Sequence, residues 1–285
     1  MSHEAGRLPG GRLGLRHGPI ELAIGAEGAA EDVERAYRAA EACFPDILPR
    51  LVEELPLLRA PMGSSRPRAK GPVARRMVEA TWPHRAVFVT PMAAVAGAVA
   101  EHVLDAMTGA ARLDRVYVNN GGDIAIHLAP GQSIAVGVVD DIARPAMDAT
   151  AKLTHASGAR GIATSGWRGR SFSRGIADAV TVVAKAAADA DAAATLIGNA
   201  VDTDHPAIRR RPARDLQIDS DLGAIPVTVA VGDLPEAAIE AALESGLAEA
   251  RRLIDRGTIL AAYLSLAGSR RAALSPGAFP AMIAA

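Results

Sequence analysis

The spacing of hydrophobic residues predicts that the first part of the chain is largely helical. Residues Glu31 to about Arg59 carry apolar side chains at helical spacing, and Pro45 and Pro49 divide this stretch into shorter pieces. A second helix is predicted over Met92 to Thr108, where the early face consists almost entirely of Ala and Gly. Small side chains let another backbone pack very close to such a helix.

The middle of the chain has β-branched or alternating segments that are typical of strands. Arg115–Asn119 and Asp123–Leu128 are separated only by turn residues, so we expect them to form a hairpin. The other expected strands, two of which precede the middle region, are Pro19–Ile24, Arg85–Thr90, Ser133–Asp140, Gly161–Ser165 and Ala179–Lys185.

The last third combines both element types and completes the prediction of the fold. A helix is expected over Asp189–Val201, then strands near Leu216–Ile218 and Pro226–Val231, then helices over Pro235–Asp255 and Gly257–Leu266. We therefore predict the α+β class, with mixed sheets flanked by helices in two closely joined subdomains. Residues 1–18 are expected to form a flexible N-terminal tail, and residues 19–285 a single α+β domain.

Charge and hydropathy exclude two classes of partner. The 31 basic and 32 acidic residues leave a formal charge of -1, which lacks the positive surplus that nonspecific binding to nucleic acid requires. The first 18 residues do not resemble a cleaved signal peptide, and no uninterrupted apolar stretch reaches the roughly 18 residues of a membrane span. We expect a cytoplasmic protein that binds neither nucleic acid nor membrane.

Cysteine and histidine give no sign of a zinc site. Cys43 is the only cysteine, so a disulfide framework or a CxxC metal knuckle is excluded, and a buried structural thiol is favoured over a reactive one. The seven histidines form no HExxH or HxxxH pair, which argues against a zinc hydrolase.

A polar turn joins the two strands of the expected hairpin and consists of Asn119, Asn120, Gly121, Gly122 and Asp123. The glycines can take positive φ and leave backbone N–H groups uncovered, so that a phosphate or similar anion could approach the main chain. Because Asn-Gly is also the strongest short hairpin signal, a purely structural turn stays an alternative. Two asparagines and an aspartate are more polar groups than a turn needs.

Asp191 and Thr195 are four residues apart in an expected helix and therefore share one face. Both could present oxygen to a hard cation such as magnesium, whereas Asp189 would point elsewhere. The alternative is that Asp191 only stabilises the first turn of the helix through the helix dipole.

Between these two segments, a strand runs into a glycine-punctuated turn that contains Thr164, Ser165, Gly166 and Arg168. Hydroxyl and guanidinium groups beside exposed main chain suit a phosphate or carboxylate, although an ordinary basic hairpin has the same composition. Ser165 is not a nucleophile elbow, because the glycine that G-x-S-x-G requires two residues before the serine is absent.

Two further polar stretches are weaker candidates. The first is a basic loop over residues 59–76, which we favour as a solvated surface over a cover for an anionic ligand. The second holds Asp202, Asp204 and His205, whose chemistry suits a metal but whose spacing matches no known ligand pattern, so it is kept as a reserve site.

In their order and spacing, four of these segments together resemble the ApbE superfamily of flavin transferases. They are Val118–Ile124, Ile162–Gly166, Ala179–Ala184 and Ala190–Thr195, and they extend over roughly residues 115 to 200. The flanking stretches Gly71–Met77 and Thr90–Val99 are more similar to an uncharacterised cytoplasmic ApbE-like branch, which extends the resemblance over most of the chain.

The resemblance implies a fold, a chemistry and roles for particular residues. ApbE proteins use magnesium to cleave FAD and move the FMN phosphoryl group to a threonine of a target protein. By resemblance, Asp191 and Thr195 match the metal ligands, with Asp123 and Asp191 as the catalytic carboxylates. The nucleotide would be lined by Asn119, Asn120, Gly121, Gly122, Thr164, Ser165, Gly166 and Arg168.

The same resemblance suggests the ligand and a competing function. The branch occurs in organisms that use methanopterin-type one-carbon carriers, so the phosphate-bearing ligand would be a flavin such as FAD or a pterin-like cofactor. A transferase of the phosphoryl or nucleotidyl type is therefore expected. Where the transferases carry a histidine, this chain has Ser173–Asp178, which favours a non-catalytic ligand-binding protein as the alternative. A homo-oligomer, with Met92–Thr108 as a contact, is left open.

Overall fold

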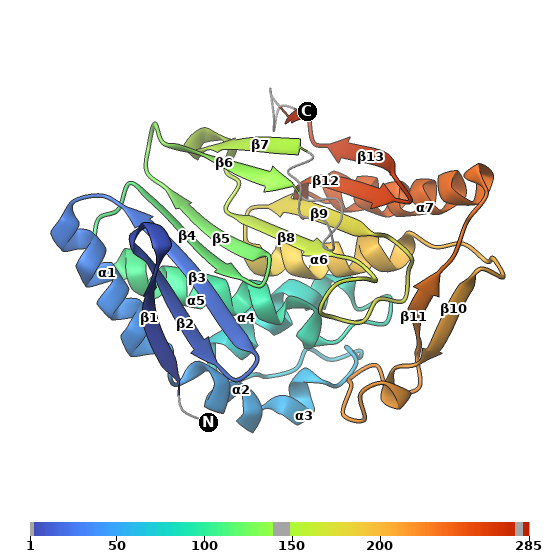
Figure 1. Cartoon of the computed structure of the whole chain (residues 1–285). Helices are drawn as coiled ribbons and strands as arrows, with labels where there is room; N and C mark the ends of the chain where they lie inside the picture. Colours follow the sequence, from blue (N-terminus) through green and yellow to red (C-terminus); the bar gives the residue numbers. More distant parts are fainter. Residues whose placement is uncertain (1–2, 139–148, 277–281, 285) are drawn as a thin grey trace. The chain divides into compact units, whose positions relative to one another are not determined.

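The computed structural model describes residues 3–138, 149–276 and 282–284, which fold into two compact units (Figure 1). The first unit contains Met1–Ile134, Leu153–Ala163 and Ala184–Ala192, and the second contains Ala135–Lys152, Thr164–Val183 and Ala193–Ala285. The chain is α+β as predicted, with antiparallel sheets and helices. The two units agree with the two expected subdomains, whereas a single domain over residues 19–285 stays a prediction.

Most of residues 4–17 lie in strands, so the prediction of a flexible tail is wrong for the described part of residues 1–18. Strand β1 (Glu4–Leu8) pairs antiparallel with β2 (Arg12–His17), and β2 pairs with β3 (Ile20–Glu27). Leu13 and Leu15 lie on either side of Gly14 in β2, between Arg12 and Arg16, and both are buried, with relative exposures of 1% and 2%. The sequence does not predict these strands because their alternating pattern is short and is interrupted by glycines and arginines.

The first unit is built on an antiparallel sheet. Its strand order is β1-β2-β3-β4-β5-β8, where β4 is Arg115–Asn120, β5 is Asp123–Leu128 and β8 begins at Gly161 and ends at Ser165 in the second unit. The expected hairpin is confirmed, since β4 pairs directly with β5 from Arg115–Leu128 to Asn120–Asp123.

Helices accompany this sheet, and α5 packs against both β4 and β5 while α1 and α4 pack against α5. The elements are α1 (Ala30–Cys43), α2 (Ile47–Glu53), α3 (Leu55–Leu58), α4 (Pro72–Thr81) and α5 (Val95–Ala110), with short 3-10 turns at Pro9–Gly11, Trp82–His84, Pro91–Ala94 and His155–Ser157. The predicted helical region before residue 59 and the helix after Pro91 are thereby confirmed, the latter starting as a 3-10 turn.

Small side chains dominate the core around α5, as the Ala and Gly content suggested. Ala94, Ala98 and Ala100 are completely buried, as are Ala187 and Ala192 in the segment that opens helix α6. Backbones can approach closely where no side chain intervenes. The core of the first unit therefore depends on close contacts between main chains.

The second unit has its own strands and helices. After the end of β8, strands β9 (Ala179–Ala184), β12 (Ile259–Leu266) and β13 (Ser269–Leu274) follow one another, and α7 (Glu236–Asp255) packs on β12 and β13. Helix α6 (Ala187–Ala200) enters this unit at Ala193. The remaining elements are β6 (Ser133–Val138), β7 (Ala149–Thr154), β10 (Ile208–Pro212), a 3-10 turn at Ala213–Asp215, β11 (Pro226–Val231) and β14 (Met282–Ala284).

Four predictions about local structure are wrong. The basic loop predicted over residues 59–76 ends at Gly71, because Pro72 begins helix α4. Residues 85–90 form turns rather than a strand, since Pro91 and the preceding 3-10 turn fix the local path. Residues 216–218 lie in a loop, and the strand of that region is β10. The predicted helix Gly257–Leu266 is strand β12, because a short apolar run fits a buried strand as well as a helix.

The other expected strands are present, although the predicted end of Ser133–Asp140 lies outside the described residues beyond Val138. In the described ranges, every helix is too short or too polar to cross a membrane.

The burial of β2 makes a testable prediction. Leu13→Ala should lower the free energy of unfolding by about 2–4 kcal/mol, because it removes most of a buried side chain and leaves a cavity. Arg16→Ala, at the exposed position of the same strand, should change it by about 0.5 kcal/mol or less. Urea denaturation of both variants measures the two free energies of unfolding. Equally small changes in both variants would support a flexible tail instead of a buried strand.

Candidate functional site

The polar turn between β4 and β5 has the backbone that its glycines permit. Gly121 and Gly122 have φ values of 66° and 115°, in the region that favours glycine in two-residue hairpins. The Asn119 side chain accepts a hydrogen bond from the Gly122 N–H at 2.8 Å, which closes the turn. A Cβ on Gly122 would meet no atom within 4 Å, so the main chain is open at this point. Asn119 is thus part of the turn itself.

Asn120 fixes the hairpin to helix α5. Its side chain is 91% buried, at 9% relative exposure, and its Nδ2 donates to the Ala96 carbonyl at 3.1 Å. Asp123 is opposite Asn120 in the register of the hairpin. The sequence assigned Asn120 to ligand binding, and the structure gives its amide group a structural partner.

Helix α6 begins in a very narrow space. A Cβ on Gly97 of α5 would lie 2.3 Å from the Ala187 carbonyl oxygen, and a Cβ on Gly161 of β8 would lie 2.3 Å from the Ala187 nitrogen. Atoms cannot approach this closely, so only glycine fits at either position. These two glycines allow the start of α6 to lie against α5 and β8 at backbone distance.

The helices α5 and α6 cap one another with carboxylates. Gly97, in the first turn of α5, donates its N–H to an oxygen of Asp191 at 3.0 Å. Ala188, in the first turn of α6, donates its N–H to an oxygen of Glu101 at 2.8 Å. First-turn N–H groups have no partner inside their own helix, and negative charge near them is favourable. Asp191 is therefore held by α5 as well as by its own helix.

Glu101 is itself held in place by an arginine. Arg76 of α4 donates to the second oxygen of Glu101 at 2.6 Å and to Asp105 at 2.6 Å. Glu101 is 12% exposed, and its two oxygens serve two different donors. A line of charged contacts thus runs from α4 through α5 to the first turn of α6.

Asp191 lies beside Asp123 in the first unit, although 67 residues separate them in the sequence. Burial and the nearby Asp123 carboxylate raise the pKa of Asp191 well above its usual range, while N–H groups of Gly97 and Ala96 oppose that shift. Two carboxylates in a poorly solvated place repel one another unless a proton or a cation lies with them.

The donor set fits a hard divalent cation. Asp123 and Asp191 could supply two carboxylate oxygens to such an ion. Thr195 follows Asp191 by one turn of α6 and belongs to the second unit. In the described part of the chain, no three His, Cys, Asp or Glu side chains gather as a complete ligand group. A cation here would therefore need substrate phosphate or water to complete its coordination, as is usual for magnesium.

The remaining predicted site residues stand in the second unit. The hydroxyls of Thr164 and Thr181 are 2.9 Å apart, and a Cβ on Gly166 would lie 2.2 Å from the Asp178 carbonyl oxygen. A Cβ on Gly198 of α6 would lie 3.5 Å from the Ser165 hydroxyl. Gly166 is thus required by a close backbone approach to residue 178.

Arg168 is engaged by neighbours. Its Nε lies 3.3 Å from an oxygen of Asp178, and its guanidinium is 4.8 Å from the centre of the Trp167 ring. The same carboxylate accepts from the Trp167 indole N–H at 3.3 Å and from the Ala267 N–H at 2.7 Å. Asp178, which the sequence did not single out, therefore organises the turn that carries Arg168.

The weaker candidates have structural partners. Asp202 forms an ion pair with Arg210, and the His205 Nδ1 accepts from the Ala207 N–H at 3.2 Å. Cys43 is half-buried rather than buried, its thiol donates to the Ala40 carbonyl at 3.3 Å, and burial raises its pKa to about 11. An unreactive thiol at neutral pH agrees with its expected structural role.

The family model described as AbpE bacteria matches residues 5–272. The chain belongs to this family. The ApbE-like resemblance expected from the motifs is thereby confirmed. The match includes β1, β2 and the hairpin of the candidate site, as well as α6.

Several relatives share part of the chain. A UPF0280 protein of Methanothrix thermoacetophila is 39% identical over 134 residues, which are 47% of this chain and 54% of that protein. A UPF0280 protein of Methanopyrus kandleri is 38% identical over 152 residues, or 53% and 55% of the two chains. This AbpE-family chain thus spans about half the length of the curated relatives it matches.

The solved structures to which this chain is similar include the apo form of the flavinyl transferase ApbE from Pseudomonas stutzeri. Its TM-score is 0.47 at 14% identity, covering 99% of this chain and 97% of that one. The ApbE protein of Thermotoga maritima gives a TM-score of 0.49 at 12% identity, covering 96% and 97%.

Gly97 and Glu101 are the residues that sequence reasoning missed. The Ala and Gly face of the helix after Pro91 predicted close packing, and this signal could have pointed to Gly97. Nothing in the sequence marks Glu101 as the partner of the Ala188 N–H, because the two are brought together only by the fold.

The narrow space at Gly97 gives a prediction. Gly97→Ala should lower the free energy of unfolding by about 1–3 kcal/mol, because its Cβ forces the start of α6 away from α5. Gly109→Ala, near the end of the same helix with no atom within 4 Å of a Cβ, should change it by about 1 kcal/mol or less. Guanidinium denaturation compares the two, and matching values would show that α6 is not held at Gly97.

Asp189 gives a prediction about pH. Burial, together with the nearby Glu101 and Glu79 carboxylates, raises its pKa from 3.8 to about 6. Because the folded chain then holds a proton that the unfolded chain releases, this group makes stability fall as pH rises from about 4 to about 6. Asp189→Asn should therefore match the native chain near pH 4 and exceed its stability by about 1–3 kcal/mol at pH 7.

Denaturation of the native chain and of Asp189→Asn across this pH range measures the difference between their free energies of unfolding. Asp114→Asn, which changes an exposed aspartate of the same unit, serves as the control for the substitution of a carboxylate by an amide. A difference for Asp189→Asn that stays constant with pH would contradict the assignment.

Proposed function

We propose that this AbpE-family protein is a magnesium-dependent transferase of the phosphoryl or nucleotidyl type that acts on a phosphate-bearing cofactor. The cofactor is a flavin nucleotide such as FAD or a pterin-type molecule. The observation that carries the proposal is the closeness of Asp123 and Asp191, two carboxylates of which Asp123 directly follows the open Gly121-Gly122 turn.

The electrostatics of the pair support a cation. Repulsion between carboxylates that are partly removed from water is strong, and a divalent ion held by Asp123 and Asp191 would offset it. The carboxylate oxygens of Asp123 and Asp191 suit magnesium better than zinc or copper. Repulsion between the carboxylates thus lowers the stability of the metal-free chain, and a bound ion would remove this effect.

The chain's own residues would position the ligand. The Gly97 N–H fixes the Asp191 carboxylate, and Asn120 ties the hairpin with Asp123 to the same turn of α5. The backbone at Gly122 is open to an anionic oxygen, as hairpin N–H groups at positive φ often are. A bound magnesium ion supplies Lewis-acid polarisation of a phosphoryl oxygen and neutralises developing negative charge.

The family supports a place for this reaction in methanopterin-linked one-carbon metabolism. This part of the proposal rests on the resemblance to the ApbE-like branch found in organisms with such carriers. Relatives of the chain come from Methanothrix thermoacetophila, Methanopyrus kandleri and Archaeoglobus fulgidus. A cytoplasmic location and homo-oligomerisation remain part of the same proposal.

One observation favours a second function, that of a non-catalytic binding protein. The segment Ser173–Asp178 is used for packing, since a Cβ on Gly175 would lie 2.1 Å from the Gly198 carbonyl oxygen. The buried Ser173 hydroxyl accepts the Gly175 N–H at 3.2 Å. This segment offers no histidine for proton transfer, so a ligand would be held without being cleaved.

A magnesium titration tests the leading proposal. Adding magnesium should raise the melting temperature of the native chain, and Asp191→Asn should lose this increase because it removes one carboxylate from the pair. Without metal, Asp191→Asn should be the more stable protein, since the amide keeps the Gly97 bond and ends the repulsion. Asp189→Asn, two residues away on the same helix, should keep the response to magnesium.

Incubation with magnesium and FAD then separates the two functions. Release of AMP and a covalent flavin on a threonine peptide, both abolished by Asp191→Asn, support the transferase. Tight FAD binding without turnover that is unchanged in Asp191→Asn would exclude the metal-dependent enzyme and favour the binding protein. A magnesium response that Asp191→Asn retains would remove the proposed metal site.

A further inference from the structure

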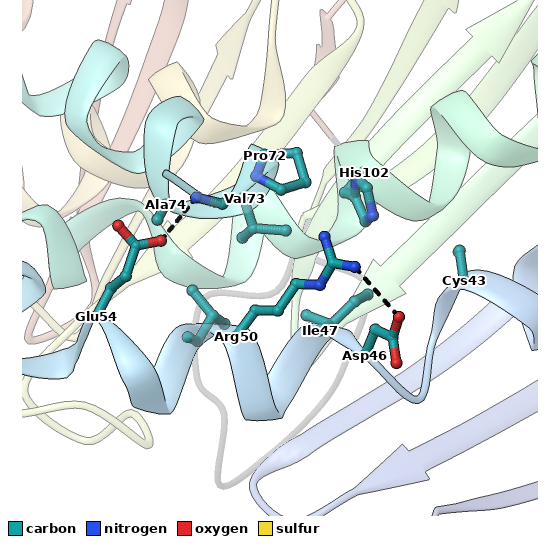
Figure 2. A pocket seen from close by; sticks show the side chains of 11 residues that line it. Cys43, Asp46, Ile47, Arg50, Glu54, Pro72, Val73, Ala74 and His102 are labelled. Atoms are coloured by element: carbon teal, nitrogen blue, oxygen red, sulfur yellow. Dashed lines mark hydrogen bonds and ion pairs between the residues drawn. The ribbon is translucent and has the colours of Figure 1, made fainter. Parts of the chain in front are cut away.

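A cavity of about 190 Å³ opens in the first unit among the end of α1, helix α2, the start of α4 and helix α5 (Figure 2). Its apolar wall consists of Ile47, Leu51, Val73 and Ala74, which are all at least 90% buried. None of the residues that line it belongs to the Asp123 and Asp191 pair or to the polar turn. It is therefore a separate hollow with its own chemistry.

Two nitrogen groups meet at this cavity. Figure 2 shows the Arg50 guanidinium reaching from α2 toward the His102 imidazole of α5. Burial and the nearby Arg76 and Arg50 guanidinium groups lower the pKa of His102, so the ring is neutral at pH 7. A guanidinium beside a neutral imidazole can donate from both groups to one anionic oxygen.

Arg50 is available for such a contact. Its ion pair with Asp46 is 3.4 Å long, and the two side chains are 58% and 73% exposed. Exposed pairs of this kind hold a side chain only weakly, so an anion in the cavity can compete with Asp46. The pair therefore leaves Arg50 free to turn toward a ligand.

A second cavity of about 490 Å³ adjoins the first and shares Arg50, Glu54 and Gly71 with it. Arg68 and Lys70 of the basic loop line this cavity, and within the described residues no ion pair engages either side chain.

The carboxylates at these cavities are mostly occupied. Glu54 uses both oxygens to accept the N–H groups of Lys70 and Gly71, each at 2.7 Å. Asp46 is paired with Arg50, and Glu53 is exposed at the rim. The cations that remain available therefore belong to Arg50, Arg68 and Lys70.

We propose that these adjoining cavities bind a small organic phosphate ester, with its apolar body in the inner cavity and its phosphate between Arg50 and the basic loop. A dry cavity of about 150 Å³ is known to accept benzene, so a benzyl group is of the right size for the inner wall. The dianionic head matches three cations better than a monoanion does. The basic loop, which the sequence analysis interpreted as a solvated surface, would then contact the phosphate of this ligand.

Calorimetry with benzyl phosphate, inorganic phosphate and benzyl alcohol tests the site. Benzyl phosphate should bind at least about tenfold more tightly than either fragment, because only benzyl phosphate both packs against the apolar wall and contacts the cations. Arg50→Met should weaken it about tenfold or more and Lys70→Gln by a smaller factor, whereas Arg38→Met, an exposed arginine of α1, should have no effect.

The single cysteine reports where the ligand binds. Cys43 lines the inner cavity, so under alkaline conditions, where its thiol begins to ionise, saturating benzyl phosphate should slow its alkylation in the native chain and not in Arg50→Met. Equal affinity for benzyl alcohol or inorganic phosphate, equal binding by Arg50→Met and Arg38→Met, or unprotected Cys43 would each overturn the proposal. Asp191→Asn should leave binding unchanged, which separates this test from that of the proposed function.

Discussion

The reciprocal capping of α5 and α6 is the interaction on which the candidate site depends. Each helix lends a carboxylate to the first turn of the other, Asp191 to the Gly97 N–H and Glu101 to the Ala188 N–H. These two bonds require backbone contact, which exists only because Gly97 and Gly161 carry no Cβ. Since Asp191 is both a cap and half of the acidic pair, the packing of two helices determines where negative charge collects.

This arrangement explains why the acidic pair lowers the stability of the protein and is at the same time suited to a functional site. A carboxylate at a helix N-terminus is stabilised by the dipole, yet the neighbouring Asp123 and the loss of water act against ionisation. The two effects leave a group that is fixed in position and ready to accept a proton or a cation. Such a balance is common at functional sites and agrees with the metal-dependent reaction that we propose.

The first unit has two polar regions of different character. The region at Asp123 and Asp191 is acidic and adjoins a glycine turn whose main chain is open, which suits a cation together with a phosphate. The region at Arg50, Arg68 and Lys70 has an apolar wall and available cations, which suits an organic anion. Helix α5 contributes to both, through Gly97 to the first and His102 to the second.

The sequence by itself determined several helices, the hairpin of β4 and β5, and the order of the motifs. Asn-Gly-Gly-Asp fixed the hairpin because glycines at positive φ leave few other turns, and the spacing of Asp191 and Thr195 placed both on α6. Strand β12 escaped sequence reasoning, since Ile259–Leu266 is apolar throughout and its period is ambiguous. Only the tertiary structure decided that Asp123 meets Asp191, that Glu101 caps α6 and that Asn120 serves α5. The physical reason is that these contacts join residues far apart in the chain, and their distances follow from backbone packing that no local pattern encodes.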